Sequence, residues 1–280
     1  MELGAIDNAG LSEDLPSLAA LGFRLSSDCS PACRDYHATW TYRRITGSVG
    51  GVEADRAALL PLIRSIDSAR DVRRWLLAGS ADSGLLAMIA AGLARPETAK
   101  FTLIDRCPTP LGVCRAYAET AGLDLVTHLA DVTDVAQSGQ ADVVVAHSTL
   151  GFVPPDRQRD VLAHLRQGLR HGGHFVLCTR WGSFTPDPLA REERVLKALE
   201  KALANNIVTL PEPRSDFERR LRRDSDTIDS RSHLPEMVEA CADLVRAAGF
   251  RDVLVSHSVA GTRHVLSQRS HWRAILHARA

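Results

Sequence analysis

Five short apolar runs, separated by longer segments, dominate the middle of this 280-residue chain. The runs cover residues 74–78, 101–105, 123–129, 141–146 and 174–179, and the segments 84–93, 111–121 and 156–169 are long enough for helices. Runs of this length are typical of strands buried on both faces, and their alternation with helices predicts a parallel sheet with right-handed crossovers. Gly172 and Gly173 are expected to end the last of these helices. The sequence therefore predicts a doubly wound α/β sheet.

The flanking segments predict further helices and a hairpin. Residues 1–70 carry helical apolar spacing, which predicts a helical N-terminal cap on a domain of residues 71–280. Prolines bracket a charged helix at 189–204, and we expect the insertion of about residues 186–233 to act as a lid. A helix over 234–248 and apolar runs at 250–256 and 272–276 follow. The short connection 259–269 between these runs predicts a hairpin, and hence an antiparallel strand at one edge.

Composition excludes several classes of function. Lys and Arg total 34 and Asp and Glu total 34, so the strong positive field that nonspecific nucleic-acid binding requires is absent. The chain has no run of 18 apolar residues and an acidic start, so we expect no membrane span, no secretory signal and a cytoplasmic location. The expected partner is a small-molecule substrate, and the sequence leaves a homodimer open.

The six cysteines are read as structural thiols. An even number of cysteines in a long chain without a secretory signal does not favour a disulfide framework. Only Cys29 and Cys33 are close in sequence, and no second pair completes a zinc ligand set, so no metal site is expected.

Small and acidic residues follow the first three runs. The turn after the first run contains Gly79, and small residues there allow a ligand to approach the backbone at the strand ends. Asp105 ends the second run and can accept hydrogen bonds from ribose hydroxyls. Asp131 follows the third run, where its carboxylate can bind an adenine amine while Val132 packs on the ring. Together these positions indicate an adenosine site, although for either aspartate taken alone a helix cap or a loop contact is the favoured interpretation.

With these features, residues 72–185 resemble the class I S-adenosylmethionine (SAM)-dependent methyltransferases. The resemblance implies a Rossmann-like, seven-stranded sheet with the last strand antiparallel, and SAM across the ends of the first, second and fourth strands. By motif position it assigns Gly79, Ala81 and Ser83 to the methionine part of SAM, Asp105 to the ribose and Asp131 to the adenine amine.

The sequence departs from the family pattern at one position. The acidic residue that usually precedes the first glycine by two positions is Leu77 here, whereas Asp82 is an additional acid inside the turn. Either Asp82 replaces the missing carboxylate, or the amino-acid end of SAM is held differently.

Two further stretches narrow the resemblance. Residues 105–111, which include Arg106 as a further cofactor-binding candidate, and residues 35–43 are similar to bacterial methyltransferase-like proteins that include the azetidine-2-carboxylate synthases. That branch implies a reaction of SAM on itself, in which the amino nitrogen attacks the γ carbon and methylthioadenosine leaves. The absence of an acid at Leu77 favours this route because one partner of the extended, charged ammonium is lost.

Candidates for chemistry lie in the cap and after the fourth run. Arg43 can hold the SAM carboxylate, and Trp40 or Tyr36 can shield the sulfonium by cation–π contact, although packing in the core explains these side chains equally well. In the segment that follows the fourth run and would face the sulfonium, His147 can act as a general base beside Ser148, and a role in positioning the backbone remains the alternative. The catalytic candidates are therefore His147, Ser148 and Tyr36.

Two other nucleotide-binding classes fit less well. The first turn lacks the glycine spacing that a dinucleotide pyrophosphate requires, and no GxxxxGK[ST] motif occurs. A noncatalytic module that binds SAM or adenosine remains an alternative because the glycine turn is degenerate.

Overall fold

The computed structural model describes residues 12–68, 72–133, 140–181, 188–231, 233, 237–257 and 272–280. Seven strands form one sheet in the order β3-β2-β1-β4-β5-β7-β6. Strands β1 to β5 are parallel, whereas β7 pairs antiparallel to both β5 and β6. The prediction of a doubly wound sheet with an antiparallel last strand is therefore confirmed.

The strands alternate with helices as the sequence pattern predicts. Their bounds are β1 Arg74–Ala78, β2 Lys100–Asp105, β3 Asp124–Leu129, β4 Ala141–His147, β5 Leu169–Trp181, β6 Arg251–His257 and β7 Trp272–Arg279. The helices of the sheet region are α3 Arg56–Asp67, α4 Gly84–Gly92, α5 Pro108–Ala121, α6 Pro155–Gly168 and α9 Val238–Ala247. The connection predicted at 259–269 lies outside the described residues.

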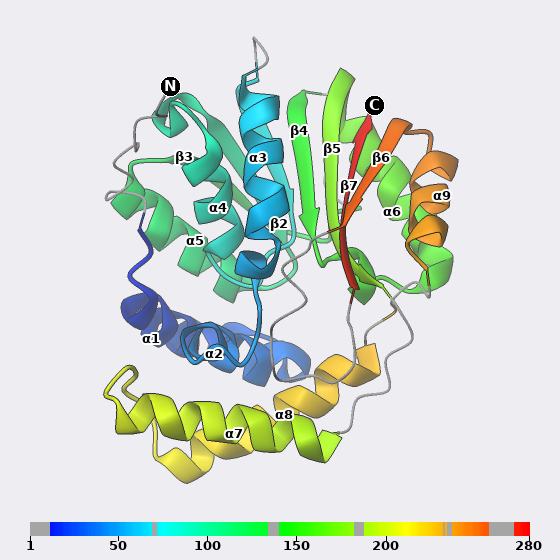
Figure 1. Ribbon diagram of the computed structural model, residues 1–280. Helices are drawn as coiled ribbons and strands as arrows, with labels where there is room; N and C mark the ends of the chain where they lie inside the picture. Colours follow the sequence, from blue (N-terminus) through cyan, green and yellow to red (C-terminus); the bar gives the residue numbers. More distant parts are fainter. Residues whose placement is uncertain are drawn as a thin grey trace.

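Helices cover both faces of the sheet (Figure 1). One core joins α3, α4 and α5 to inward side chains such as Trp75 and Phe101, both of which are 1% exposed. The opposite core joins α6 and α9 to the alternate residues of the same strands, including Leu76 and Phe175. Because both faces are covered, each central strand is a continuous apolar run, which is the pattern seen in the sequence.

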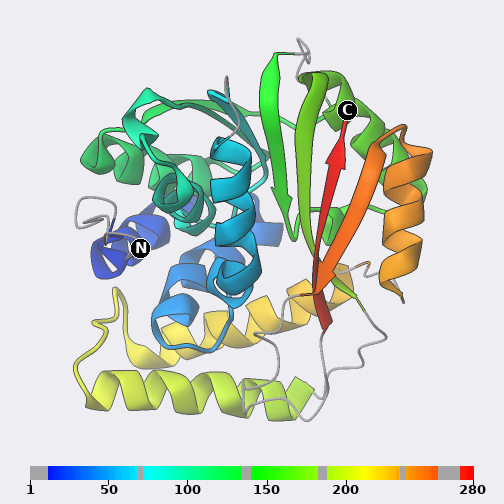
Figure 2. The ribbon, with the colours of Figure 1, turned by 45° about the horizontal axis from the view of Figure 1, so that its top comes forward.

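Four more helices lie at the carboxyl ends of the parallel strands (Figures 1 and 2). They are α1 Leu15–Leu25, α2 Pro31–Ile45, α7 Pro188–Ala204 and α8 Arg214–Arg231. Helices α7 and α8, from the predicted lid, pack on α1 and α2 through a third core that contains Tyr42 and Phe217. Helix α3 of the predicted cap packs on a face of the sheet, where Leu59 and Ile63 are fully buried in the core that Leu18 of α1 also joins.

The predicted role of the glycine pair is wrong. Helix α6 ends at Gly168, and Gly172 and Gly173 lie inside β5, next to a register shift in its pairing with β4. A Cβ atom on Gly173 would lie 2.9 Å from the Arg170 carbonyl oxygen, so the irregularity requires a residue without a side chain. Among the described residues, no helix is long and apolar enough to cross a membrane.

Candidate functional site

The turn after β1 approaches the end of β4 closely. Gly79 has φ +79°, and a Cβ atom there would lie 2.9 Å from Thr149 Oγ1. The Gly79 amide donates to the Ile104 carbonyl at 2.8 Å, and the Thr149 hydroxyl donates to the Ala78 carbonyl at 2.7 Å. Glycine is therefore required here by both backbone conformation and space, and the turn is fixed against both neighbouring strands.

Asp105 is held at the end of β2 by two backbone amides. The Ser80 amide donates to Oδ2 at 2.9 Å, and the Cys107 amide donates to Oδ1 at 2.8 Å. Burial raises the pKa of the Asp105 carboxyl to about 6, although these two hydrogen bonds act in the opposite direction. Each carboxylate oxygen can accept a further hydrogen bond, so Asp105 is oriented for a ligand with two donors.

Asp131 follows β3 and forms a local loop contact. Its Oδ1 accepts hydrogen bonds from the Thr133 amide at 3.0 Å and from the Thr133 hydroxyl at 2.8 Å. Its Oδ2 lies 3.6 Å from Nε of Arg106, whose side chain is 78% exposed. Although burial acts in the opposite direction, the Thr133 hydrogen bonds lower the pKa of Asp131. The adjacent Val132 packs against the core below.

Asp82 is fully engaged by the protein. Arg44 donates from Nη1 to Oδ2 at 2.7 Å, Thr41 donates to the same oxygen at 3.3 Å, and the Gly84 amide donates to Oδ1 at 2.9 Å. Asp82 is 5% exposed. The hypothesis that Asp82 replaces the acid missing at Leu77 is therefore not supported, because its charge is compensated inside the cap.

Ser83 belongs to the same buried hydrogen-bond network as Arg44. The Ser83 side chain is fully buried and donates to Glu13 Oε1 at 2.5 Å. Arg44 binds the other Glu13 oxygen at 2.8 Å and also pairs with Glu53. The Ser83 side chain thus points into the packed cap, whereas Ala81 is partly exposed at the turn.

His147 ends β4 and forms a buried charged cluster. Its Nε2 lies 2.9 Å from Oδ2 of Asp55, which precedes α3. Arg273 from β7 donates from Nε to the other Asp55 oxygen at 2.7 Å. Although burial acts in the opposite direction, the Arg273 and His147 hydrogen bonds lower the pKa of Asp55 to about 2. The next residue, Ser148, has φ +58°, which is unusual for a residue other than glycine.

The aromatic candidates lie together on α2. The Tyr36 ring centroid lies 5.1 Å from that of Trp40 and 4.9 Å from that of His37. Tyr36 and Trp40 are half-buried, whereas Arg43, which lies farther along the helix, is only 2% exposed. The structure therefore brings Tyr36 and Trp40 together and places Arg43 inside the cap.

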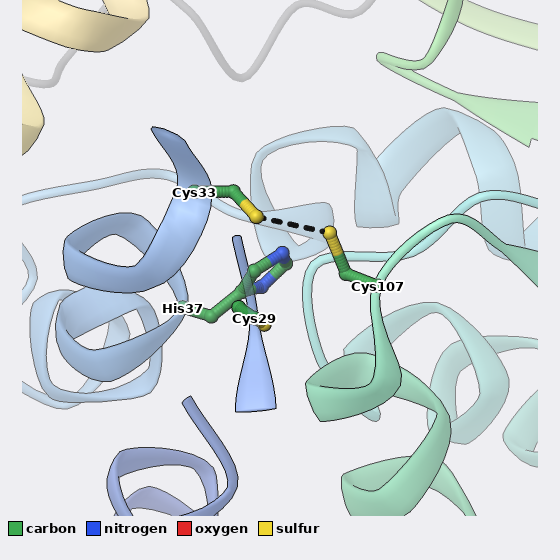
Figure 3. Close-up of side chains that lie close together, drawn as sticks. All are labelled: Cys29, Cys33, His37 and Cys107. Atoms are coloured by element: carbon green, nitrogen blue, oxygen red, sulfur yellow. Dashed lines mark hydrogen bonds between the residues drawn. The ribbon is translucent and has the colours of Figure 1, made fainter. Parts of the chain in front are cut away.

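The structure brings together four side chains that could ligate a metal, although the cysteine spacing in the sequence predicts no metal site. Cys29, Cys33, His37 and Cys107 lie together between α2 and the turn after β2 (Figure 3). Cys107 is 74 residues from Cys33, so no local spacing could indicate this set.

Three further residues form buried ion pairs near the carboxyl ends of the strands and were not identified from the sequence. They are Arg44, Asp55 and Arg273. Each is paired with groups distant in the chain, such as Arg44 with Asp82 and Arg273 with Asp55. The local sequence around a buried charged residue with such a distant partner does not differ from the sequence around an exposed charged residue.

Comparisons with known proteins agree with this arrangement. Residues 79–173 match a protein family described as a methyltransferase domain. Among curated proteins, the chain is 27% identical over 162 residues to a carboxy-S-adenosyl-L-methionine synthase of Dichelobacter nodosus (strain VCS1703A). The match covers 57% of this chain and 60% of the relative, which is less than two thirds of the relative's length.

Solved structures share the fold at low sequence identity. The CurJ carbon methyltransferase has a TM-score of 0.56 and 18% identity, and the match covers 98% of this chain and 67% of that one. PigF with SAH has a TM-score of 0.50 and 15% identity, with 94% and 62% covered. At these identities the similarity concerns the fold.

Proposed function

We propose that this chain is a class I SAM-dependent methyltransferase that transfers the methyl group of SAM to a small molecule, since residues 79–173 match a methyltransferase domain and the sheet has the strand order given above. The observation that carries the proposal is the Asp105 carboxylate, which two amides orient beside the Gly79 turn. Both oxygens retain acceptor capacity, which suits the two hydroxyls of a ribose. PigF, which shares the fold, is a structure with SAH, the product of methyl transfer from SAM.

The remaining parts of SAM are proposed to bind residues near the ends of the other strands and on α2. Asp131 Oδ2 and Val132 are proposed to bind the adenine, with Arg106 beside them. The backbone of residues 79–81 is proposed to border the methionine part. Tyr36 and Trp40 are proposed to shield the sulfonium, since cations are attracted to aromatic faces. Arg43 is proposed as the carboxylate partner, which requires that its buried guanidinium reach the site.

His147 is proposed as the general base. In methyl transfer the acceptor nucleophile forms a bond to the methyl carbon as the carbon–sulfur bond breaks, and the sulfonium becomes a neutral thioether. The acceptor loses a proton, which an imidazole can take. Asp55 holds the His147 ring through Nε2 at 2.9 Å and can stabilise the imidazolium that forms. Ser148 is proposed to border the acceptor.

A second candidate reaction is the cyclisation of SAM, and one observation favours it. Leu77 stands where the family has an acid, and Asp82 is engaged by Arg44, so neither supplies a carboxylate for the SAM ammonium. In this reaction the deprotonated amino nitrogen attacks the γ carbon, the carbon–sulfur bond breaks, and methylthioadenosine leaves with the electron pair. The curated relative is named as a carboxy-S-adenosyl-L-methionine synthase, so the product in that name is a derivative of SAM.

Calorimetric titration with S-adenosylhomocysteine tests the site. Asp105→Asn should weaken binding by about 1–3 kcal/mol, or roughly 5- to 150-fold, because the ribose hydroxyls lose a charged acceptor. Asp124→Asn, at the exposed amino end of β3, is the matched control and should bind like the wild type. Equal affinity of the Asp105 variant and the control would contradict the assignment.

Incubation with SAM alone distinguishes the reactions. Methylthioadenosine together with a cyclic amino acid, detected by mass spectrometry, would establish cyclisation. No product until an acceptor is added would support methyl transfer. Binding of SAM without turnover over a panel of acceptors would support a noncatalytic module, and binding of NADH in place of SAM would overturn the proposal.

A further inference from the structure

Four side chains that can ligate a metal lie between α2 and the turn after β2 (Figure 3). They are Cys29, Cys33, His37 and Cys107, and their ligand atoms all lie within 4.8 Å of one another. The sulfurs of Cys33 and Cys107 are 3.2 Å apart. In a tetrahedral zinc site with zinc–sulfur bonds of about 2.3 Å, two sulfurs lie roughly 3.8 Å apart. The four ligand atoms therefore already occupy a volume of the size that one zinc ion requires.

His37 gives an independent indication of a ligand. It is only 7% exposed, and its Nδ1 meets no hydrogen-bond partner among the described residues. The other ring nitrogen bonds the backbone of Ala81. A buried nitrogen without a partner costs free energy. A histidine bound to a metal commonly donates its second ring N–H to a carbonyl, and His37 has this arrangement with its free lone pair near the sulfurs.

The set of donors points to zinc. Three sulfurs and one imidazole form one of the usual combinations of structural zinc sites, and soft thiolates disfavour magnesium and calcium. Cys33 and His37 are four residues apart on α2 and therefore share one face of the helix, while Cys29 lies just before the helix begins. A disulfide between Cys33 and Cys107 would explain neither the position of Cys29 nor the unpartnered His37 nitrogen.

We propose that Cys29, Cys33, His37 and Cys107 bind one structural zinc ion that joins α2 to the turn after β2. Four protein ligands complete the tetrahedron and leave no position for a substrate, so the ion has a structural role. The Cys107 amide binds Asp105, and His37 binds the backbone at Ala81. The zinc site would thereby brace both turns of the proposed SAM site, although its presence does not depend on SAM binding.

A second group of metal-ligating side chains carries no such proposal. Asp55, His147 and Cys178 also lie together. The Arg273 guanidinium binds both oxygens of Asp55 and lies 3.4 Å from His147 Nε2. A cation from the protein therefore already compensates the acid in that cluster.

The first test is the metal content of the full chain, purified without chelators and without SAM. We expect inductively coupled plasma mass spectrometry to find one zinc ion per chain. Cys29→Ser and Cys107→Ser should each lower the affinity for added zinc roughly tenfold or more. Cys241→Ala is the matched control, since Cys241 is also buried but lies on α9, and it should keep the zinc.

Cobalt provides a readout that does not depend on stability. The apoprotein loaded with cobalt(II) should show the visible bands of a tetrahedral site and a thiolate-to-cobalt charge-transfer band. His37→Cys should keep the metal with a stronger charge-transfer band, whereas His37→Ala should bind it less tightly. Chelation should lower the Tm of the wild type by several degrees and lower the Tm of Cys107→Ser by less, because a ligand that binds only the folded state stabilises it in proportion to its affinity.

Three results would overturn the proposal. The first is a zinc-free wild type whose Tm does not respond to added zinc. The second is an octahedral cobalt spectrum without charge transfer. The third is equal zinc binding by Cys107→Ser and wild type. None of these measurements includes SAM. A negative result would therefore overturn the zinc site without bearing on the proposed SAM site, which the Asp105 titration tests.

Discussion

At the scale of single residues, the carboxyl ends of the parallel strands contain unusual backbone conformations and buried charged side chains. Gly79 and Ser148 both have positive φ and lie at the ends of adjacent strands β1 and β4. Conformations of this kind cost about 1–3 kcal/mol for residues other than glycine and occur preferentially at functional sites. The two positions mark where the backbone departs from regular strands to border the proposed ligand.

Gly79→Ala should destabilise the protein more than an alanine at a glycine with similar φ. The new Cβ would meet the Thr149 side chain at 2.9 Å, whereas a Cβ on Gly122, with φ +66°, meets nothing within 4 Å. We expect Gly79→Ala to lower the free energy of unfolding by about 2–4 kcal/mol and Gly122→Ala by about 1 kcal/mol. Urea denaturation measures both, and equal losses would show that the contact with Thr149 is relaxed.

The Asp55 cluster predicts a stability change at acid pH. The folded-state pKa of Asp55 is about 2, below its ordinary value of 3.8, so its contribution is present above about pH 4 and is lost as the pH falls through 2. The linked free energy is about 2 kcal/mol, and it depends on the facing Arg273 and His147. Asp55→Asn should flatten the plot of stability against pH between 4 and 2. Asp243→Asn, an exposed control, should leave that slope unchanged.

At the scale of elements, α8 rests on α2 through ion pairs. Arg220 and Arg223 donate to opposite oxygens of Asp35 at 2.8 and 2.6 Å, and Arg220 also binds Glu212. These arginines belong to the basic run of residues 219–223, which has the composition of a helix face exposed to solvent. Their pairing with Asp35 on α2 adds to the apolar core that already packs α8 on α2.

Asp35→Asn should loosen α8 without unfolding the sheet. Half-exposed pairs each contribute up to about 1 kcal/mol, so hydrogen exchange in α7 and α8 should become roughly 5-fold faster, while β1 and β4 remain protected. Asp216→Asn breaks an exposed pair within α8 and serves as the control. Exchange in α8 that does not differ between the two variants would show that Asp35 does not anchor this helix.

The elements also show what the sequence can and cannot predict. The buried strands β1, β2 and β4 follow from their apolar runs, and the acids after β2 and β3 follow from the strand order. The bulge at Gly172 was missed because a glycine pair after a helix and one inside a strand have the same local signature. The cluster of Cys107 with His37 was missed because it depends on how α2 packs against the turn after β2, and local spacing contains no information on that packing.

At the scale of the whole molecule, one buried arginine connects the cap to the sheet. Arg44 on α2 reaches Asp82 in the turn after β1, Glu13 before α1 and Glu53 before α3. Burial raises the pKa of the Asp82 carboxyl, and the Arg44 guanidinium opposes this shift. Removal of the cation would leave acidic groups buried without compensation, which is more costly than the loss of an exposed pair.

Arg44→Leu should therefore destabilise the cap and the sheet together. We expect a loss of about 3–5 kcal/mol in the free energy of unfolding, in a single transition that tryptophan fluorescence and far-UV circular dichroism report at the same denaturant concentration. Arg115→Leu is the control, because Arg115 makes an exposed contact with Thr127 on the sheet and should change stability by less than about 0.5 kcal/mol. Two separated transitions in Arg44→Leu would show that the cap unfolds independently, and the ion pairs would then hold it in place without coupling its folding to the sheet.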